Sequence, residues 1–435
     1  MSENPFAQKL TKKQYEAEVA KTRDARMKWF ADAKFGMFVH YGPYAVAGMH
    51  EWYLALSGIS NEQYEREVTQ KFHPKKGCAY EWAKLASEAG CKYMVMVTRH
   101  HDGYSMWDSD CNPYNVVKYG HDYDVVAEFV DACRKYNMRI GLYHSIIDWH
   151  NPDCGDSAKD FDARIRFIKY HRDMLTELLT RYGKIDMLWY DMCYPFTGEN
   201  LDFVATNSMV RTLQPDIIIN PRSGLDEDLD TPEERLNPTG KQKYFEACMT
   251  FNGLSWGYVD SEEIAGYSYT PQRIIKMMAE TADRNGNLLL NIGPAPDGSV
   301  PADAVKPLQI VGEWLKVNGA AIYGASKPID MWVPNGRPTL KKDNMLYVIQ
   351  LITPVLGYLP VNGVGAPVKK VRCLTDGKEY EFTQEGTELT ILGVAHGHVD
   401  KIAGVTVFEV TCGEPFGKFQ RTVPPSLAAT LREEL

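Results

Sequence analysis

Short apolar runs recur through the first three quarters of the chain, and amphipathic stretches separate them. The runs are FGMFVHYG (35–42), KYMVMVTRHH (92–101), RIGLYHS (139–145), IDMLWYD (185–191), DIIINPRS (216–223), YFEACMTF (244–251) and NLLLNIGP (287–294). Most positions in these runs are apolar, which is typical of parallel strands covered on both faces. We therefore expect a largely parallel sheet in this part of the chain.

The stretches between the runs carry apolar residues at helical spacing, as in 82–89, 125–133 and 165–179. Strands that alternate with helices in this way predict an α/β fold, a (β/α)8-type, TIM-like barrel. Its eighth strand should be irregular or lie near 321–323. An open doubly wound sheet is the alternative. No G-x-G-x-x-G follows the first run, so a dinucleotide site lacks its usual mark.

The pattern changes after about residue 325. Four β-like runs follow, MLYVIQLI (345–352), KKVRCL (369–374), TELTILG (387–393) and GVTVFEV (404–410), with Gly, Pro, Asn and Asp between them. This spacing predicts a small C-terminal antiparallel β-sandwich domain. We expect a catalytic barrel with an N-terminal helical extension in 1–325, the sandwich in 326–412 and a tail in 413–435.

Composition narrows the classes of partner. The chain has 435 residues and a net charge of −9 without a Lys/Arg-rich block, which argues against nucleic acid. Aromatic residues reach 11%, including 25 tyrosines and 9 tryptophans. Such a content suits either a large aromatic core or surfaces that pack on sugar rings. The positions of the aromatic residues in the fold decide between a core and a sugar-binding surface.

Cysteine usage and the N-terminus bear on the compartment. Nine cysteines, an odd number without a C-x-x-C pair, predict a reduced protein. The start MSENPFAQKLTKKQYEAEV lacks the apolar core of a signal peptide, and no apolar run reaches the length of a membrane span. We expect a cytoplasmic protein without a membrane partner, although a removed signal would leave the same sequence. A homo-oligomer is compatible with this size.

The apolar runs end on polar or titratable residues, which in barrels form the active site at the carboxyl ends of the strands. These residues are His40, His100, His101, Tyr143, Trp189, Asp191, Arg222 and Glu246. Capping and solvation could explain any one of them. A metal site is not expected, because adjacent residues of a strand point to opposite faces and no H-x-H or H-E-x-x-H motif is present.

Two of these residues are carboxylates with different surroundings. Asp191 ends its run two residues after Trp189, so an aromatic ring would lie beside an ionised group. Glu246 stands among Phe245, Cys248 and other apolar residues, which should raise the pKa of its carboxyl. Such a pair matches glycoside hydrolysis. The alternatives are a turn cap for Asp191, and for Glu246 an ion pair with Lys243 or Arg222.

Longer blocks around these residues carry a family resemblance. They are WFADAKFGMFVHYGPYAVAGMHEWY (29–53), RHHDGYSMWDS (99–109), DYDVVAEFVDACRKYNMRIGLYHS (122–145), IDMLWYD (185–191), QPDIIINPRSG (214–224), FEACMTFNGLSWGY (245–258), NGNLLLNIGPAPDGSV (285–300) and EWLKVNGAAIYG (313–324). In this order the chain resembles the α-L-fucosidases of glycoside hydrolase family 29. The blocks cover nearly the whole predicted barrel.

The resemblance implies a retaining, exo-acting enzyme that removes terminal α-L-fucose from oligosaccharides or glycoconjugates through a covalent fucosyl-enzyme intermediate. It implies no metal and no organic cofactor. Asp191 falls at the position of the nucleophile and Glu246 at that of the acid/base, with Glu51 and Glu233 as further candidates for the acid/base. The resemblance assigns fucose binding to His40, Glu51, Trp52, His100, His101, Tyr143, Trp189 and Arg222, and the wall beside the C6 methyl group to Trp256.

Two positions depart from the family pattern, and two rival functions stay open. Met192 replaces a common glycine after the nucleophile, and Phe245 replaces a common tryptophan before Glu246. The first change bears on linkage preference. The rivals are another exo-glycosidase on a similar barrel, acting on a hexose such as galactose, and a fucose-binding protein without catalysis. The presence of both carboxylates argues against the second.

Overall fold

The computed structural model describes residues 4–191, 201–240, 242–260, 264, 266–326, 331, 333–334, 336–341, 344–354, 356–394 and 396–415. The chain forms two compact units, Met1–Thr281 with Asn285–Glu313, and Ala282–Arg284 with Trp314–Leu435. The expected boundary after residue 325 therefore lies inside the second unit. The physical reason is that the Trp314 indole N–H donates to the carbonyl of Val405, 2.7 Å away, within the second unit.

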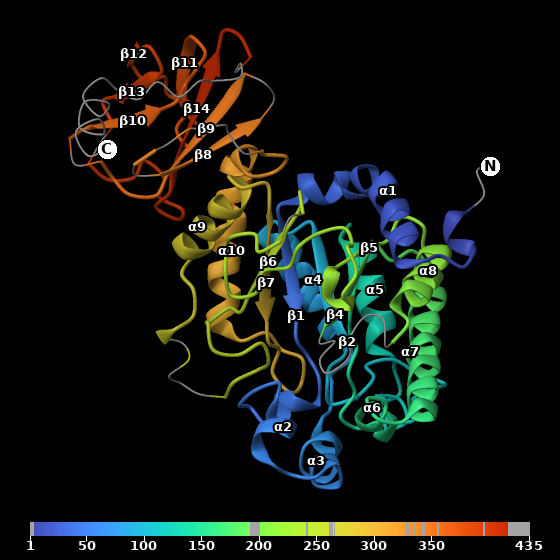
Figure 1. Ribbon diagram of the computed structural model, residues 1–435. Coiled ribbons are helices and arrows are strands. Elements are labelled where there is room, and N and C mark those ends of the chain that lie inside the picture. The colour runs from blue at the N-terminus through green and yellow to red at the C-terminus, as the bar shows by residue number, and fades with distance from the viewer. Residues whose placement is uncertain are drawn as a thin grey trace, which may run out of the picture. The chain divides into compact units, whose positions relative to one another are not determined.

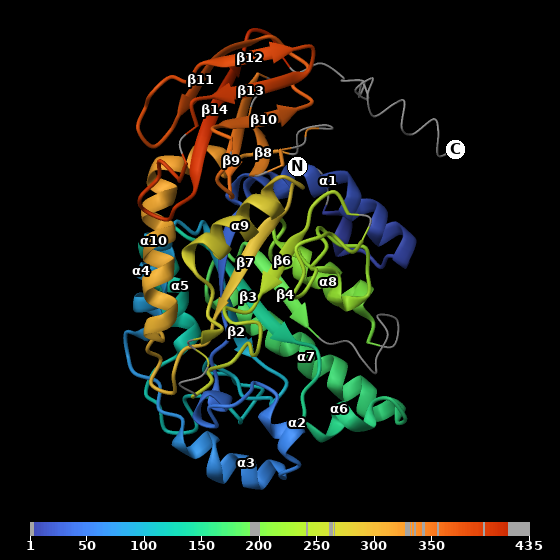
Figure 2. The same ribbon diagram turned by 90° about the vertical axis from the view of Figure 1, so that its left-hand side faces the viewer.

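The first unit is built on a parallel sheet. Its strands are β1 (Phe35–Val39), β2 (Tyr93–Arg99), β3 (Arg139–Ser145), β4 (Met187–Asp191), β5 (Ile218–Ile219), β6 (Glu246–Met249) and β7 (Asn287–Ile292). The seven strands run in the order β5-β4-β3-β2-β1-β7-β6 (Figures 1 and 2). Their side chains are almost all buried, as the apolar runs predicted. The predicted barrel-type fold is confirmed, on a curled sheet of seven strands.

An irregular segment lies between the two edge strands. On one side the Asp228 amide donates to the carbonyl of Ile219 in β5, at 3.1 Å. On the other side residues 230–234 exchange backbone hydrogen bonds with residues 244–248, which include β6. This segment takes the place of an eighth strand. The alternative position near 321–323 was wrong, because Gly319–Ala321 is a turn of 3-10 helix.

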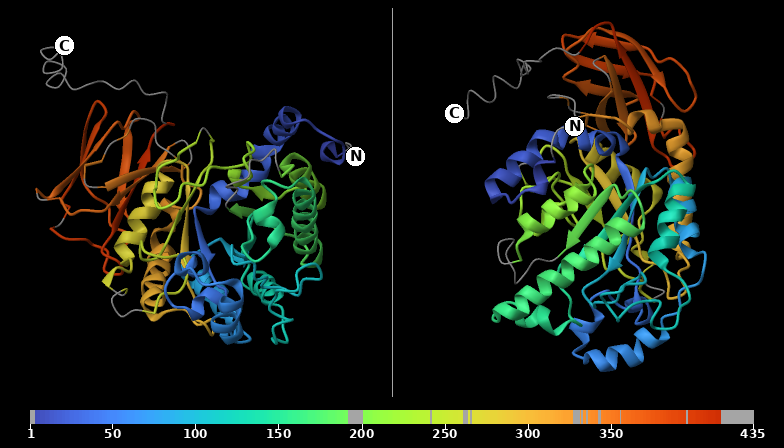
Figure 3. Two further views of the ribbon diagram at one scale, coloured as in Figure 1. Left: turned by 60° about the horizontal axis from the view of Figure 1, so that its bottom comes forward. Right: turned by 90° about the vertical axis from the view of Figure 1, so that its right-hand side faces the viewer.

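Helices precede, separate and follow the strands of the parallel sheet. They are α1 (Lys12–Ala33), α2 (Tyr53–Ser57), α3 (Asn61–Glu67), α4 (Cys78–Ala89), α5 (Val125–Lys135), α6 (Pro152–Asp156), α7 (Phe161–Arg181), α8 (Phe203–Leu213), α9 (Pro271–Ala282) and α10 (Ala302–Asn318). Figure 3 shows the green helices α7 and α8 outside the parallel strands. Asp124 and Asp160 cap α5 and α7 by accepting hydrogen bonds from amides of the first turn. No helix in the described part of the chain is long and apolar enough to cross a membrane.

Aromatic side chains fill the space enclosed by the sheet. Phe38, Tyr93, Tyr143 and Trp189 are buried and pack with Val95 and other apolar residues in one cluster. Phe38 and Trp189 lie with their ring centroids 5.2 Å apart. This rigid core supports the polar residues that follow the strands. Part of the high aromatic content therefore belongs to the core.

The second unit contains two antiparallel sheets. One has the order β10 (Tyr358–Asn362), β13 (Glu388–Leu392), β12 (Phe382–Glu385). The other has the order β11 (Val368–Cys373), β14 (Thr406–Cys412), β9 (Met345–Gln350), β8 (Gly336–Lys341). Residues of both sheets, such as Leu346, Leu359, Ile391 and Val410, share one buried core. The prediction of a β-sandwich is confirmed.

Candidate active site

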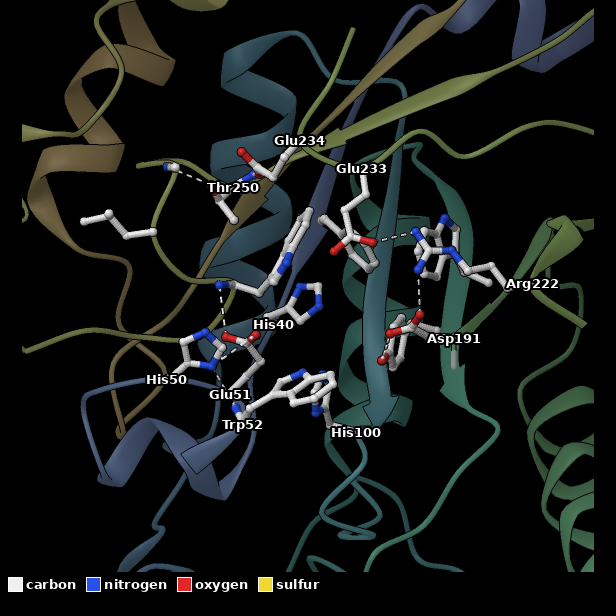
Figure 4. Close-up of a pocket in the computed structure, with 16 residues that line it drawn as sticks. His40, His50, Glu51, Trp52, His100, Asp191, Arg222, Glu233, Glu234 and Thr250 are labelled. Carbon is white, nitrogen blue, oxygen red and sulfur yellow. Dashed lines mark hydrogen bonds and ion pairs between the residues drawn. The ribbon is translucent and has the colours of Figure 1, made fainter. Parts of the chain in front are cut away.

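A pocket of about 300 Å³ opens at the carboxyl ends of the strands of the first unit (Figure 4). Its lining combines aromatic rings with ionisable groups. It contains Phe38, His40, His50, Glu51, Trp52, His100, Tyr143, Trp189, Asp191, Arg222, Glu233, Glu234, Thr250, Gly253, Leu254 and Trp256. The volume is at the low end for ligand pockets, about 300–1,000 Å³, and suits one small polar ligand.

Asp191 is the last residue of β4, and its carboxylate faces the pocket (Figure 4). The Tyr143 hydroxyl donates to Oδ2 at 2.8 Å, and Nη1 of Arg222 donates to Oδ1 at 2.8 Å. Nε2 of His101 lies 3.5 Å from Oδ2. The Asp191 side chain is 15% exposed. It is therefore oriented from two sides and still open to a ligand.

Arg222 joins two carboxylates. It follows β5 in a turn of 3-10 helix, and while Nη1 contacts Asp191, Nη2 donates to Oε2 of Glu233 at 2.7 Å. Glu233 belongs to the irregular segment beside β6, and its side chain is 44% exposed. The Arg222 guanidinium carbon lies 4.7 Å from the Trp189 ring centroid. Asp191 and Glu233 are thus held by neighbouring nitrogens of one guanidinium group.

Two of the histidines are uncharged at neutral pH. Burial lowers the pKa of His40 and of His101 from 6.5 to about 4. Nδ1 of His40 lies 2.7 Å from Oδ1 of Asn291, and Nδ1 of His101 lies 2.6 Å from Oγ of Ser145. A neutral imidazole has one donor and one acceptor nitrogen, which suits it to bind hydroxyl groups.

Glu51 ties a loop to the wall of the pocket. Its Oε2 accepts hydrogen bonds from Oγ of Ser255 at 3.0 Å, from the amide of Trp256 at 3.1 Å and from the amide of Gly257 at 3.2 Å. The Trp256 ring lies 5.1 Å from the His40 ring. Glu51 therefore fixes the position of Trp256, which lies beside His40 on this side of the pocket.

Glu246 does not line the pocket, and the expectation that it is the acid/base is corrected. It is the first residue of β6, whereas Asp191 is the last residue of β4. Its side chain is fully buried, where Oε1 accepts from the Trp189 indole N–H at 3.0 Å and Oε2 accepts from the Tyr93 hydroxyl. The predicted direction of its pKa is confirmed, since burial raises the pKa to about 7. The residue lacks access to a substrate.

The structure brings most of the other predicted residues together. His40, Glu51, Trp52, His100, Tyr143, Trp189, Asp191, Arg222 and Trp256 line the pocket, together with the further candidate Glu233. His101 lies behind the lining, against Asp191. Met192 lies outside the described residues. The alternative of an ion pair for Glu246 is not found, because Lys243 pairs with Asp24 and Arg222 with Asp191 and Glu233.

Sequence reasoning missed several residues of the lining, namely Phe38, His50, Glu234, Thr250, Gly253 and Leu254. Oε1 of Glu234 accepts the Thr250 amide at 2.5 Å, and burial raises the pKa of Glu234. The backbone of Glu234 has φ +51°, an uncommon value for a residue other than glycine. The segment 228–234 lacks an apolar run, so periodicity could not place it, and only the adjacent glutamates of PEER hinted at it. Among the described residues, no cluster of three or more His, Cys, Asp or Glu side chains could hold a metal ion.

The model of the family described as Alpha-L-fucosidase matches residues 4–320. The chain belongs to the α-L-fucosidase family. The matched range spans the sheet of the first unit and every residue of the pocket. The expected kinship with glycoside hydrolase family 29 is confirmed.

Known α-L-fucosidases resemble this chain in sequence and in fold. The tissue α-L-fucosidase of Bos taurus is 32% identical over 386 residues, which are 82% of this chain and 81% of that protein. The structure of α-L-fucosidase isoenzyme 1 from Paenibacillus thiaminolyticus is similar with a TM-score of 0.82 and 32% identity, over 90% of this chain and 100% of that one. The structure of a GH29 α-L-fucosidase from Bacteroides thetaiotaomicron, trapped as a covalent intermediate with 2-fluoro-fucosyl fluoride, is similar with a TM-score of 0.81 and 25% identity. This similarity covers 89% of this chain and 96% of that one.

Proposed function

We propose that this protein is a retaining, exo-acting α-L-fucosidase that hydrolyses terminal α-L-fucosides through a covalent fucosyl-enzyme. One observation carries the proposal: a single guanidinium, that of Arg222, holds the carboxylates of Asp191 and Glu233 at one small pocket. Retaining glycosidases use two carboxyl groups about 5 Å apart. The α-L-fucosidase from Bacteroides thetaiotaomicron, trapped as a covalent intermediate, supports the retaining course.

In the first step a carboxylate oxygen of Asp191 attacks the anomeric carbon of fucose. The bond to the leaving oxygen breaks, and the protonated carboxyl of Glu233 gives that oxygen its proton. Arg222 and Tyr143 orient Asp191 for the attack, since both donate to its carboxylate. Glu233 is suited to meet the leaving group because its side chain is 44% exposed. The products are the released alcohol and a fucosyl ester of Asp191.

In the second step the ionised Glu233 takes a proton from water, and the resulting hydroxide attacks the anomeric carbon. The ester bond breaks, Asp191 regains its charge, and α-L-fucose leaves with its original configuration. Neutral His40, which lines the pocket, can donate a hydrogen bond to a sugar hydroxyl or accept one from it throughout. The small pocket admits one sugar, which suits an exo-acting enzyme.

The nucleophile is tested with Asp191→Gly on an aryl α-L-fucoside. We expect loss of turnover by a factor of about 10⁴ or more, because a covalent step is removed. Azide should restore cleavage and give β-L-fucosyl azide, since a single displacement inverts the anomeric carbon. Turnover near that of the wild type would remove Asp191 from the mechanism.

The proton donor is tested with Glu233→Ala and azide. Here Asp191 still forms the ester and azide attacks it, so two inversions should give α-L-fucosyl azide. The loss of rate should be larger for a poor leaving group than for a good one. If Glu233→Ala behaves like the wild type with both leaving groups, another residue is the acid/base.

A panel of aryl glycosides separates the rival functions. Turnover of the α-L-fucoside alone supports the proposal. Turnover of an α-L-galactoside or β-D-galactoside in preference to the fucoside would favour the rival exo-glycosidase. Tight binding of fucose without turnover of any fucoside would indicate a binding protein.

A further inference from the structure

Glu246 is a buried carboxylate that the proposed mechanism does not use. Its side chain is fully buried, yet both of its oxygens accept hydrogen bonds, one from the Trp189 indole N–H and one from the Tyr93 hydroxyl. A buried carboxylate is costly unless such donors satisfy it. The arrangement joins the first residue of β6 to an aromatic side chain of β4.

Trp189 in turn contacts both groups that hold Asp191. Its ring is stacked on that of Tyr143, with centroids 5.6 Å apart and an interplanar angle of 17°. Its other neighbour is Arg222, whose guanidinium carbon lies 4.7 Å from the centroid of the Trp189 ring. Tyr143 and Arg222 each donate to one oxygen of Asp191, at 2.8 Å. A rotation of the Trp189 ring would therefore displace both donors together.

We propose that Glu246 is a positioning residue of the α-L-fucosidase: by holding the Trp189 indole it fixes Tyr143 and Arg222, and through them the attacking carboxylate of Asp191. The inference rests on the proposed function, because it concerns the same nucleophile. It assigns to Glu246 a role in the attack without any transfer of a proton to substrate. The Trp189 ring stacks on Tyr143 and contacts the Arg222 guanidinium, and Glu246 sets the rotation of that ring.

The chemistry of the carboxylate suits this task. A tryptophan indole N–H donates one hydrogen bond, and Oε1 of Glu246 accepts the bond from Trp189 at 3.0 Å. The second oxygen is anchored by Tyr93, the first residue of β2. Glu246 is thus held from a different strand than the tryptophan that it orients. The hydrogen bond from Tyr93 fixes the Glu246 carboxyl, and the hydrogen bond between Glu246 and Trp189 then fixes the indole nitrogen.

The test separates attack from proton donation by using two substrates. 2-Fluoro-fucosyl fluoride labels the nucleophile and needs little help from an acid, because fluoride is a good leaving group. An aryl α-L-fucoside with a poor leaving group needs the acid. We expect Glu246→Gln to slow labelling and turnover by the same factor, about tenfold, since a small misplacement of reacting groups costs up to about 100-fold.

A double-mutant cycle tests the route through Trp189. Trp189→Phe keeps an aromatic ring but lacks the N–H. In that background Glu246→Gln should change either rate by less than about twofold, because the coupled interaction is already absent. Glu246→Leu should be slower than Glu246→Gln, which retains one acceptor.

Glu177→Gln is the matched control. Glu177 is also buried and accepts an indole N–H, that of Trp107, at 2.8 Å, but it does not contact the pocket. The Glu177→Gln variant should have a lower midpoint of thermal unfolding, with unchanged rates of labelling and turnover. This comparison separates positioning from a general loss of stability.

Each remaining outcome overturns the inference. Unchanged rates in Glu246→Leu, which has no acceptor for the indole N–H, would show that the hydrogen bond does not matter for attack. A much larger loss with the aryl fucoside than with the fluoride would make Glu246 a proton donor. An equal loss in the Trp189→Phe background would mean that Glu246 does not act through Trp189. A wild type that cleaves no fucoside refutes the proposed function first, before any variant is compared.

Discussion

At the scale of the residue, the site depends on a guanidinium shared between two carboxylates. Arg222 contacts Asp191 with one terminal nitrogen and Glu233 with the other. The planar fork of arginine can do this, whereas the ammonium of lysine is a single point of charge. The same side chain packs over the Trp189 ring. One residue thus orients both carboxylates.

We expect Arg222→Lys to lower kcat/KM for an aryl α-L-fucoside about 100-fold, because one of the two oriented contacts is lost. Arg139→Lys is the matched control. Arg139 lies over the ring of Trp29 and pairs with Asp186, and it does not line the pocket. Equal kinetics for Arg222→Lys and the control would show that the shared guanidinium is not needed.

At the scale of the element, the level of a residue along its strand decides its role. Asp191 ends β4, while Glu246 and Tyr93 begin β6 and β2. The carboxyl ends of the parallel strands lie at the site, and their amino ends lie at the opposite end of the barrel. Two carboxylates on strands of one sheet therefore have different tasks. Tyr93, which donates to Glu246, packs closely against β1.

Gly36 in β1 lies against the Tyr93 ring, and a Cβ atom at this position would overlap it. We expect Gly36→Ala to lower the free energy of unfolding by about 1–3 kcal/mol, the usual cost of overpacking. Chemical denaturation measures this change. The variant should also lose kcat/KM, because Tyr93 holds Glu246.

Gly155→Ala is the control for that variant. Gly155 lies in α6, and a Cβ atom there has no neighbour within 4 Å. This change should leave the free energy of unfolding nearly constant or raise it slightly, because alanine restricts the unfolded chain. A similar loss in both variants would contradict the steric explanation.

At the scale of the whole molecule, several buried histidines link folding to pH. Among them, His171 in α7 is buried, and both of its ring nitrogens lack hydrogen-bond partners among the described residues. Burial is the largest cause that lowers its pKa, from 6.5 to about 3, and the charges of Arg99 and Arg172 act in the same direction. The unfolded chain therefore binds a proton below pH 6.5 that the folded protein excludes. Folding is penalised as the pH falls from 6.5 towards 3.

We expect His171→Phe to reduce this acid sensitivity. One pKa unit corresponds to about 1.4 kcal/mol, so His171 costs the wild type about 2 kcal/mol between pH 7 and pH 5. The variant should lose about that much less over the same interval. The measurement is denaturant unfolding of both proteins at the two pH values. Equal losses would show that His171 is protonated in the folded state.

The sequence by itself determined most of the elements and marked Asp191 as the candidate nucleophile. Parallel strands buried on both faces leave near-continuous apolar runs, and those runs predicted β1–β4, β6 and β7 closely. Asp191 is the polar residue that stops such a run. Its position at the end of β4 follows from local patterning alone. The family resemblance also followed from these blocks, because side chains around the pocket lie close to the strand ends.

The tertiary structure decided that Glu233 lines the pocket and that Glu246 does not. The run 244–251 contains Glu246 without showing at which end of the strand it lies, and backbone pairing places it first in β6. Glu233 stands in the irregular segment, held by hydrogen bonds to residues distant in sequence. Such pairing leaves no periodic signal. Burial then distinguishes the two: Glu246 lies within the core beside Trp189, and Glu233 lies at the pocket on Arg222.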